Sequence, residues 1–211
     1  MSCGFSLDHY RELLAAAQRG GYRYAQFDGE PEPGALYLRH DVDLDLEAAL
    51  RMSALERELG IRSTYFLMTA SVFYNLASTQ GKEALVRLRD DGHAVGLHSD
   101  WPDLRMDDRF DPLVAWHNPD PDYMREPIVG ALNVMSDPWA DNYRSDSNQH
   151  WRHGCPHGEL ERRDFEWLQL LVHPEIWVYE GATMRETMDS LLEREHERRL
   201  EQLAADRIDL S

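Results

Sequence analysis

The stretch Ala35-Leu36-Tyr37-Leu38-Arg39-His40-Asp41-Val42-Asp43 decides the fold class of this chain. Its first four residues are apolar or aromatic and predict a buried strand, which runs without a turn residue into a cation, an imidazole and two carboxylates. Residues 45–50 then open a helix, so the carboxylates fall at the carboxyl end of a strand, where α/β folds place their sites. One aspartate, Asp43 or Asp45, is enough to cap that helix. Two aspartates beside His40 are more than a cap requires, which favours a functional site.

Strands and helices alternate along the rest of the chain. Apolar periodicity and glycine stops predict helices over residues 7–18, 46–59, 81–91 and 185 to about 207. Strands are predicted over residues 21–27, 61–68, 93–100, 113–116 and 168–172, with another near residue 142. The pattern predicts an α/β fold of parallel βα units in one domain, residues 1–182. A charged C-terminal helix, in residues 183–211, is expected to pack on this domain or to extend from it.

The charge of the chain argues against several classes of partner. With 39 acidic and 22 basic residues, its net charge is −17, whereas nucleic acids and anionic membranes attract basic surfaces. A neutral or cationic substrate, or a metal cation, fits this charge better. The sequence has no apolar run near 18 residues and no basic start followed by an apolar segment. We therefore expect a cytoplasmic protein with no membrane insertion, whose oligomeric state the sequence leaves open.

Polar side chains follow several predicted strands at the point where each strand ends. His98, His117 and His173 end or follow three of them, and Asp41 and Asp43 end the opening strand. A single histidine in such a position is more often a structural residue than a ligand. Because right-handed crossovers bring the carboxyl ends of parallel strands to one rim, the five side chains are expected to converge on a site.

Five short motifs in this order resemble those of the polysaccharide deacetylases, the NodB-like enzymes of carbohydrate esterase family four. They are similar to the branch whose first motif is His-Asp-Val-Asp, and the resemblance covers about residues 7–179. The motifs are His-Asp-Val-Asp at residues 40–43, Gly-His-x-x-Gly-Leu-His at 92–98, His-Asn-Pro at 117–119, Asp-Ser…Trp-Arg at 146–152 and Leu-x-His-Pro-Glu at 171–175.

The resemblance implies a deformed (β/α)7-type barrel that uses one divalent metal ion, most often zinc, to remove acetyl from an N-acetylated sugar. The connection between residues 98 and 117 is short for a full barrel unit and leaves little room for a helix at residues 104–111. We therefore expect an incomplete barrel.

The family pattern also implies roles for individual residues. By that pattern Asp41 is the catalytic base and Asp43 a metal ligand, or the two roles are exchanged. His98 corresponds to the first metal-binding histidine, and His173 to the histidine that protonates the leaving amine. Asp146 is a candidate to orient His173 and to keep it protonated, because a carboxylate beside an imidazole raises its pKa.

The chain departs from the family pattern at two points. The second histidine of the second motif is replaced by Pro102, which cannot bind a metal, so a third ligand must come from elsewhere. We predict His117 for this place, with Asp100 in reserve, because imidazole is a good zinc ligand. His117 itself stands where most members of the family have an arginine, and either Arg152 or Arg39 is a candidate to replace that arginine.

The remaining candidates are residues for substrate binding. Trp116 and Trp151 are predicted either to stack on sugar rings or to belong to the core, which is the commoner fate of such aromatics. Asn118 is a candidate for the rim, together with Tyr143 and Arg144. A cluster between His150 and His157 matches no known zinc spacing, and a loop beside the site explains it equally well.

These observations predict a metal-dependent hydrolase that removes an acetyl group from an N-acetylated sugar or polysaccharide precursor. Two alternatives remain open. One keeps the fold but hydrolyses a cyclic amide without a metal. The other is a carbohydrate-binding or scaffold protein without catalysis, an alternative that Pro102 keeps open.

Overall fold

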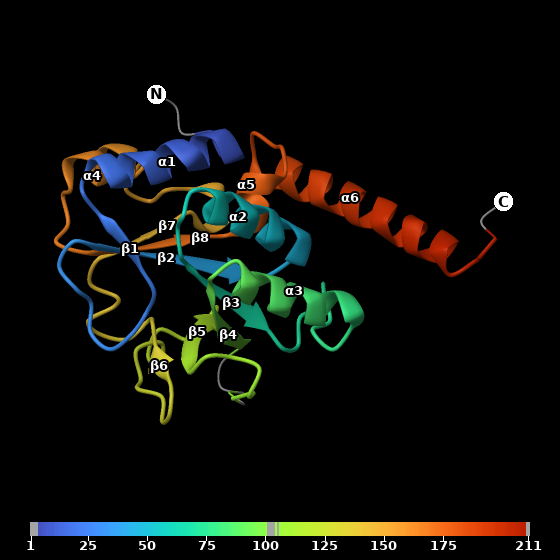
Figure 1. Cartoon of the computed structure of the whole chain (residues 1–211), viewed down its shortest axis with the longest axis horizontal. Helices are drawn as coiled ribbons and strands as arrows, with labels where there is room; N and C mark the ends of the chain where they lie inside the picture. The colour runs from blue at the N-terminus through green and yellow to red at the C-terminus, as the bar shows by residue number, and fades with distance from the viewer. Residues whose placement is uncertain (1–3, 101–103, 105, 210–211) are drawn as a thin grey trace.

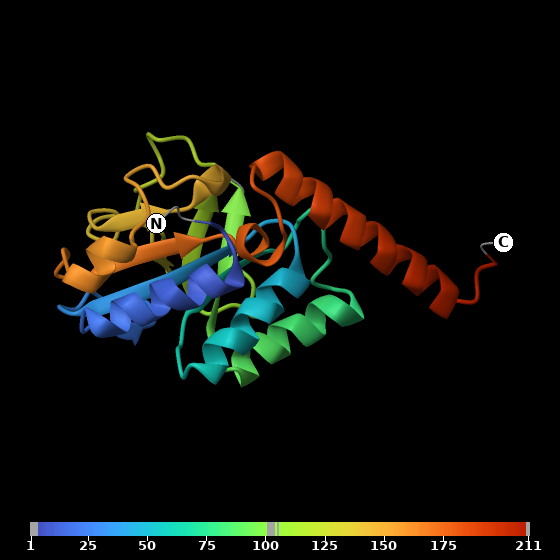
Figure 2. The same cartoon turned by 90° about the horizontal axis from the view of Figure 1, so that it is seen from above.

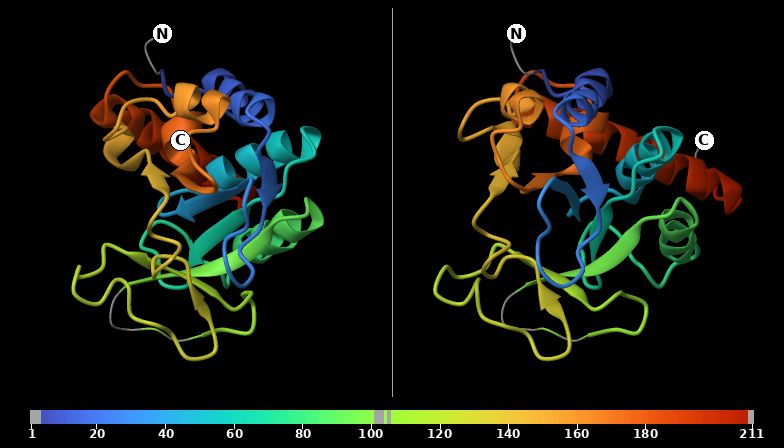
Figure 3. Two further views of the ribbon diagram at one scale, coloured as in Figure 1. Left: turned by 90° about the vertical axis from the view of Figure 1, so that its left-hand side faces the viewer. Right: turned by 60° about the vertical axis from the view of Figure 1, so that its left-hand side comes forward.

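The chain forms one parallel sheet that curls into a half-barrel, as seen in Figures 1 and 3. The computed structural model describes residues 4–100, 104 and 106–209. The sheet has eight strands in the order β6-β5-β4-β3-β2-β8-β7, with β1 pairing beside β2, and all of the named pairs are parallel. The strands are β1 (Arg23–Ala25), β2 (Ala35–Val42), β3 (Thr64–Met68), β4 (Ala94–Asp100), β5 (Leu113–His117), β6 (Leu132–Asn133), β7 (Tyr143–Ser145) and β8 (Leu168–Val172). The predicted α/β class and incomplete parallel barrel are confirmed.

Helices cover the outer face of the half-barrel, and α1, α2 and α3 lie along it in Figure 2. They are α1 (Leu7–Arg19), α2 (Leu46–Glu58), α3 (Thr79–Asp90), α4 (His157–Arg162), α5 (Pro174–Val178) and α6 (Met184–Ala205). The described residues between β4 and β5 form no helix, as the short connection predicted.

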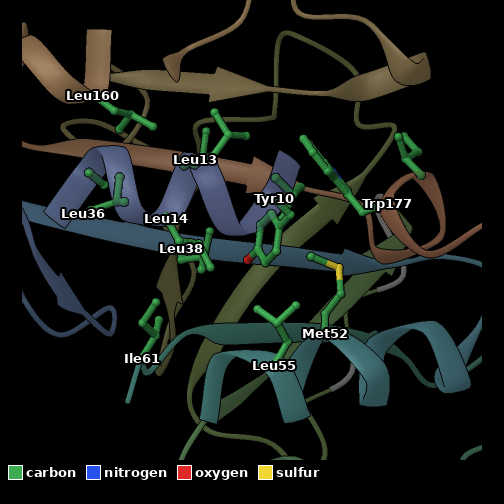
Figure 4. Packing of buried hydrophobic residues seen from close by; sticks show 14 of the residues in the cluster. Tyr10, Leu13, Leu14, Leu36, Leu38, Met52, Leu55, Ile61, Leu160 and Trp177 are labelled. Carbon is green, nitrogen blue, oxygen red and sulfur yellow. The ribbon is translucent and has the colours of Figure 1, made fainter. Parts of the chain in front are cut away.

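Strand β2 lies near the centre of the sheet, and all of its residues are buried. Leu36 and Leu38 point outward and pack with α1 and α2 (Figure 4). Ala35 and Tyr37 point inward and pack with aromatic side chains on the concave face. Because side chains alternate along a strand, the same period sends the carboxylates of the motif inward and His40 outward.

His40 therefore belongs to a buried network and not to the concave site. Its Nε2 lies 2.7 Å from Oε1 of Glu56 on α2, and both side chains are fully buried. The hydroxyls of Ser63 and Tyr65 donate to the other carboxylate oxygen, at 2.6 and 3.0 Å. Burial alone would raise the pKa of Glu56, but attraction to His40 and these hydrogen bonds lower it to about 2. The strand thus continues to Val42, four residues beyond its apolar part, because its buried charged and imidazole side chains are paired, Arg39 with Asp41 and His40 with Glu56.

We expect Glu56→Ala to destabilise the protein by about 3–5 kcal/mol, because it leaves the donors of this buried network without their acceptor. Urea unfolding measures the change. Glu58→Ala on the same helix is the control; its side chain is exposed, so it should stay within about 0.5 kcal/mol of the wild type. Equal effects of the two substitutions would contradict the structural role of Glu56.

Helix α6 extends beyond the body of the molecule, as Figure 1 shows. Thr183 and Glu186 form a capping box at its start, which places the helix one residue earlier than predicted. Arg198 ties the helix to the start of α2 through Asp45, at 2.9 Å, and Glu47, at 2.8 Å. Within the described residues, none of the helices has the length and apolar character needed to cross a bilayer.

Candidate metal centre

The register of the sheet brings three predicted ligands together at the carboxyl ends of the strands. His98 of β4 pairs with Ala115 of β5, and the last residue of β5 is His117. Asp43 follows β2 directly. One ligand atom from each of Asp43, His98 and His117 lies within 4.8 Å of the others. The ligand atoms of a tetrahedral zinc site lie about 3.4 Å apart, so small side-chain movements would bring these three onto one ion.

The hydrogen bonding of His98 fits a metal ligand. Its Nδ1 lies 2.8 Å from the carbonyl oxygen of Ala115, which only accepts, so Nδ1 is the donor. In a neutral ring Nε2 then carries no proton, and its lone pair points toward Oδ1 of Asp43. The distance between Nε2 and Oδ1 is 3.1 Å. Two facing lone pairs repel, so a positive charge between them, either a proton on Nε2 or a metal ion, would stabilise this arrangement. A backbone carbonyl that fixes the second ring nitrogen is also the usual support for a histidine ligand.

Two buried polar atoms of these residues lack a hydrogen bond within the described part of the chain. Asp43 Oδ1 and His117 Nδ1 are buried and make no well-directed hydrogen bond within the described part of the chain. Buried polar atoms are normally satisfied. Their burial beside His98 therefore fits a position for an ion.

The charges of the site favour an anionic Asp43. Burial alone would raise the pKa of its carboxyl, but contact with His98 and the nearby imidazoles lower it to about 2. The pKa of His98 is raised, because its two aspartate neighbours outweigh the effect of burial. A proton on His98 and a metal ion therefore compete for the same position.

The reserve ligand, Asp100, is not a member of the converging group. Asp100 Oδ1 is 3.5 Å from His117 Nδ1, but its side chain is 67% exposed and is not one of the three that converge. Pro102 lies outside the described residues.

His173 faces the same centre from the end of β8. Its Nε2 is 3.9 Å from Oδ2 of Asp43, and its Nδ1 is 2.6 Å from Oδ1 of Asp146. Asp146 is fully buried and also accepts from the indole of Trp177 at 2.6 Å. Burial would lower the pKa of His173, but the carboxylate of Asp146 raises it to about 10. The predicted contact between Asp146 and His173 is present, and it keeps the ring protonated at neutral pH.

We expect the ring of His173 in the metal-free protein to titrate near pH 10, which NMR of the histidine ring carbons measures, with His173→Gln to assign the signal. An unfolded histidine titrates near 6.5, so the proton binds the folded state more tightly. Its contribution to stability is full below about pH 6.5 and is lost as the pH rises toward 10. A ring that titrates near 6.5 in the folded protein would contradict the pairing with Asp146.

A cavity of about 340 Å³ opens over the centre. Its lining includes Asp43, His117, His173, Asn118 and Glu175. Sequence reasoning assigned no role to Glu175, although it lies two residues after His173 in the same motif. It is 2% exposed, its Oε2 has no hydrogen-bond partner among the described residues, and burial raises its pKa to about 8. Glu175 therefore offers a neutral carboxyl to a ligand at neutral pH.

Asp41 lies deeper than the cavity. Arg39 holds both of its carboxylate oxygens, at 2.8 and 2.6 Å, and both side chains are buried. Burial would raise the pKa of Asp41, but Arg39 lowers it. Oδ2 of Asp41 is 3.8 Å from Nε2 of His98, so it lies behind the proposed ion position. The role of Asp41 as the base stays a prediction. Arg39 and Arg152 are the candidates to replace the arginine of the family pattern, and of these two Arg39 is the one that pairs with a carboxylate of the site.

Three other candidates take different places. Trp116 and Trp151 are 2% and 5% exposed and belong to the core clusters, so the core interpretation replaces sugar stacking. Trp151 packs on Phe5, with ring centroids 6.3 Å apart. Arg152 is exposed and lines a second cavity, so its position does not support the predicted role in the catalytic centre.

Comparisons with known protein families, with curated proteins and with solved structures found no match.

Proposed function

We propose that this chain is a metal-dependent hydrolase that removes an acetyl group from an N-acetylated sugar or polysaccharide precursor. The proposal combines the motif resemblance to polysaccharide deacetylases with one structural observation. The ligand atoms of Asp43, His98 and His117 converge beside His173, which Asp146 keeps protonated, at one cavity.

The residues of the site suit the needs of amide hydrolysis. When bound by Asp43, His98 and His117, a divalent ion such as zinc polarises a carbonyl oxygen and lowers the pKa of water toward about 7. The departing nitrogen needs a proton, and His173 holds one on Nε2, the ring atom that faces the cavity. Asp146 fixes the orientation of that ring through Nδ1. Asp41 remains the predicted base.

The proposal is tested by acetate release from a panel of N-acetylated mono- and oligosaccharides. The protein is stripped with a chelator and then reloaded with zinc or cobalt. We expect release to stop on stripping and to return on reloading.

Each alternative has its own outcome in this experiment. If the protein hydrolyses a cyclic amide at the same rate with and without chelator, the metal-free hydrolase is favoured. Saccharide binding without turnover, with an affinity that His173→Ala leaves unchanged, would favour a binding protein. Either result would overturn the proposed function.

A further inference from the structure

A second cavity of about 330 Å³ lies beside the first and differs from it in charge. Its lining contains two arginines and two histidines, Arg144, Arg152, His150 and His153, and no aspartate or glutamate among the described residues. The first cavity, in contrast, is lined by Asp43, Asp100 and Glu175. In a chain with 39 acidic and only 22 basic residues, a cavity wall that lacks carboxylates and gathers cations is unusual.

One of the two arginines is already neutralised. Arg144 donates to both carboxylate oxygens of Glu159, at 2.8 Å each, and lies over the ring of Phe165. Arg152 is exposed, and within the described residues it has no ion pair or hydrogen bond. The cavity therefore carries one guanidinium whose charge no neighbouring carboxylate offsets. The rings of His150 and His153 add further nitrogen donors beside it.

The two cavities share one short segment of their walls. Ser147 and Asn148 line both of them, and this segment directly follows Asp146, the partner of His173. Asn148 and Gln149 have φ values of 56°, in the left-handed region that such residues seldom adopt. A ligand that reaches from the candidate metal centre across Ser147 and Asn148 therefore places its next group near Arg152.

We propose that the second cavity binds an anionic oxygen group, a carboxylate or a phosphate, on the part of the substrate next to the acetylated sugar. The proposal rests on the proposed function and narrows its substrate to an acidic saccharide or a sugar phosphate. Guanidinium groups bind both kinds of anion through paired hydrogen bonds. The overall charge of the chain favours neutral or cationic ligands, so a local cation is needed for an anionic substrate to bind.

Calorimetric titration with three probes tests this proposal. They are the disaccharide of glucuronate and N-acetylglucosamine, N-acetylglucosamine 1-phosphate, and the neutral dimer of N-acetylglucosamine. We expect at least one acidic probe to bind about tenfold or more tightly than the neutral dimer. A gain of this size is what one hydrogen bond between the guanidinium of Arg152 and an anionic oxygen contributes to binding. The acidic probe that gains affinity identifies the source of the anion. The gain should shrink at high salt, because Arg152 is exposed to solvent.

Arg152→Ala should remove this preference and leave affinity for the neutral dimer unchanged. Arg51→Ala is the matched control, because Arg51 on α2 is also exposed and has no ion pair or hydrogen bond within the described residues; it should keep the preference. Equal binding of acidic and neutral probes by the wild type, a preference that survives Arg152→Ala, or no binding of the acidic probes would each overturn the anion site.

The test separates this site from the proposed function. Titrations of Asp43→Asn, which lacks a metal ligand, should show the same preference for the acidic probe. If the wild type neither holds a metal nor releases acetate, the proposed function fails while the charge preference can still be measured. If acetate release depends on metal but no charge preference appears, only the anion site fails.

Discussion

Asp43→Asn should purify without the divalent ion that we propose for the wild type, and it should release no measurable acetate. Asp43 is the one anionic side chain among the three converging ligands, and its low pKa keeps it ionised throughout the physiological range. Changes to residues that only support metal ligands already cost about 10–100-fold in affinity. Loss of a direct ligand should cost more than that. Elemental analysis and competition with a metal-binding dye measure the effect.

Asp100→Asn is the matched control for this substitution. Asp100 lines the same cavity but its carboxylate lies outside the converging group, so its variant should keep the ion. The reverse result, with the ion lost from Asp100→Asn and kept by Asp43→Asn, would contradict the ligand set. It would place Asp100 in the ligand set in place of Asp43.

The metal affinity should also fall as the pH is lowered. The pKa of His98 is raised by Asp41 and Asp43 in spite of its burial, so protons occupy Nε2 more readily than in an isolated histidine. Each proton must leave before a metal binds. His98→Gln should remove binding at every pH, whereas His196→Gln, an exposed change on α6, should leave the pH dependence unaltered.

The arrangement of the site could be predicted from sequence because it follows from strand geometry. Polar residues at the ends of several strands in a parallel sheet must meet at one rim, and this rule brought Asp43, His98, His117 and His173 together. The alternation of β2 also determines that His40 and Asp41 face opposite sides of the sheet. The motif His-Asp-Val-Asp does not by itself show this difference in role.

The features that sequence reasoning missed depend on contacts between distant segments. Arg39 pairs with Asp41 only because the strand continues past its apolar part, and a run of polar residues gives no sign of that continuation. For Trp116 the sequence leaves both core packing and sugar stacking open, because its burial depends on residues of other segments that pack with β5. Arg152 belongs to an irregular segment, where no periodicity fixes the direction of a side chain.

His173→Gln should lower the turnover number by about 10²–10⁴-fold, the usual contribution of a general acid or base. Glutamine retains a polar side chain but cannot hand over the proton that Nε2 carries toward the cavity. The metal content should stay at the wild-type level, because His173 is not one of the converging ligands. Single-turnover acetate release measures the loss, with His196→Gln as the exposed control. Wild-type turnover in His173→Gln would contradict the assignment of the acid.

Asp146→Asn tests the protonation of His173 by changing the partner of its Nδ1. The carboxylate of Asp146 outweighs the effect of burial and raises the pKa of His173 to about 10, so without it that pKa should fall toward or below the ordinary value near 6.5. At neutral pH a smaller fraction of His173 then carries the proton that the amine needs. The activity lost in Asp146→Asn should therefore recover in part as the pH is lowered toward 6. A loss of the same size at every pH would assign Asp146 to positioning alone, because a purely steric role does not change the protonation of His173.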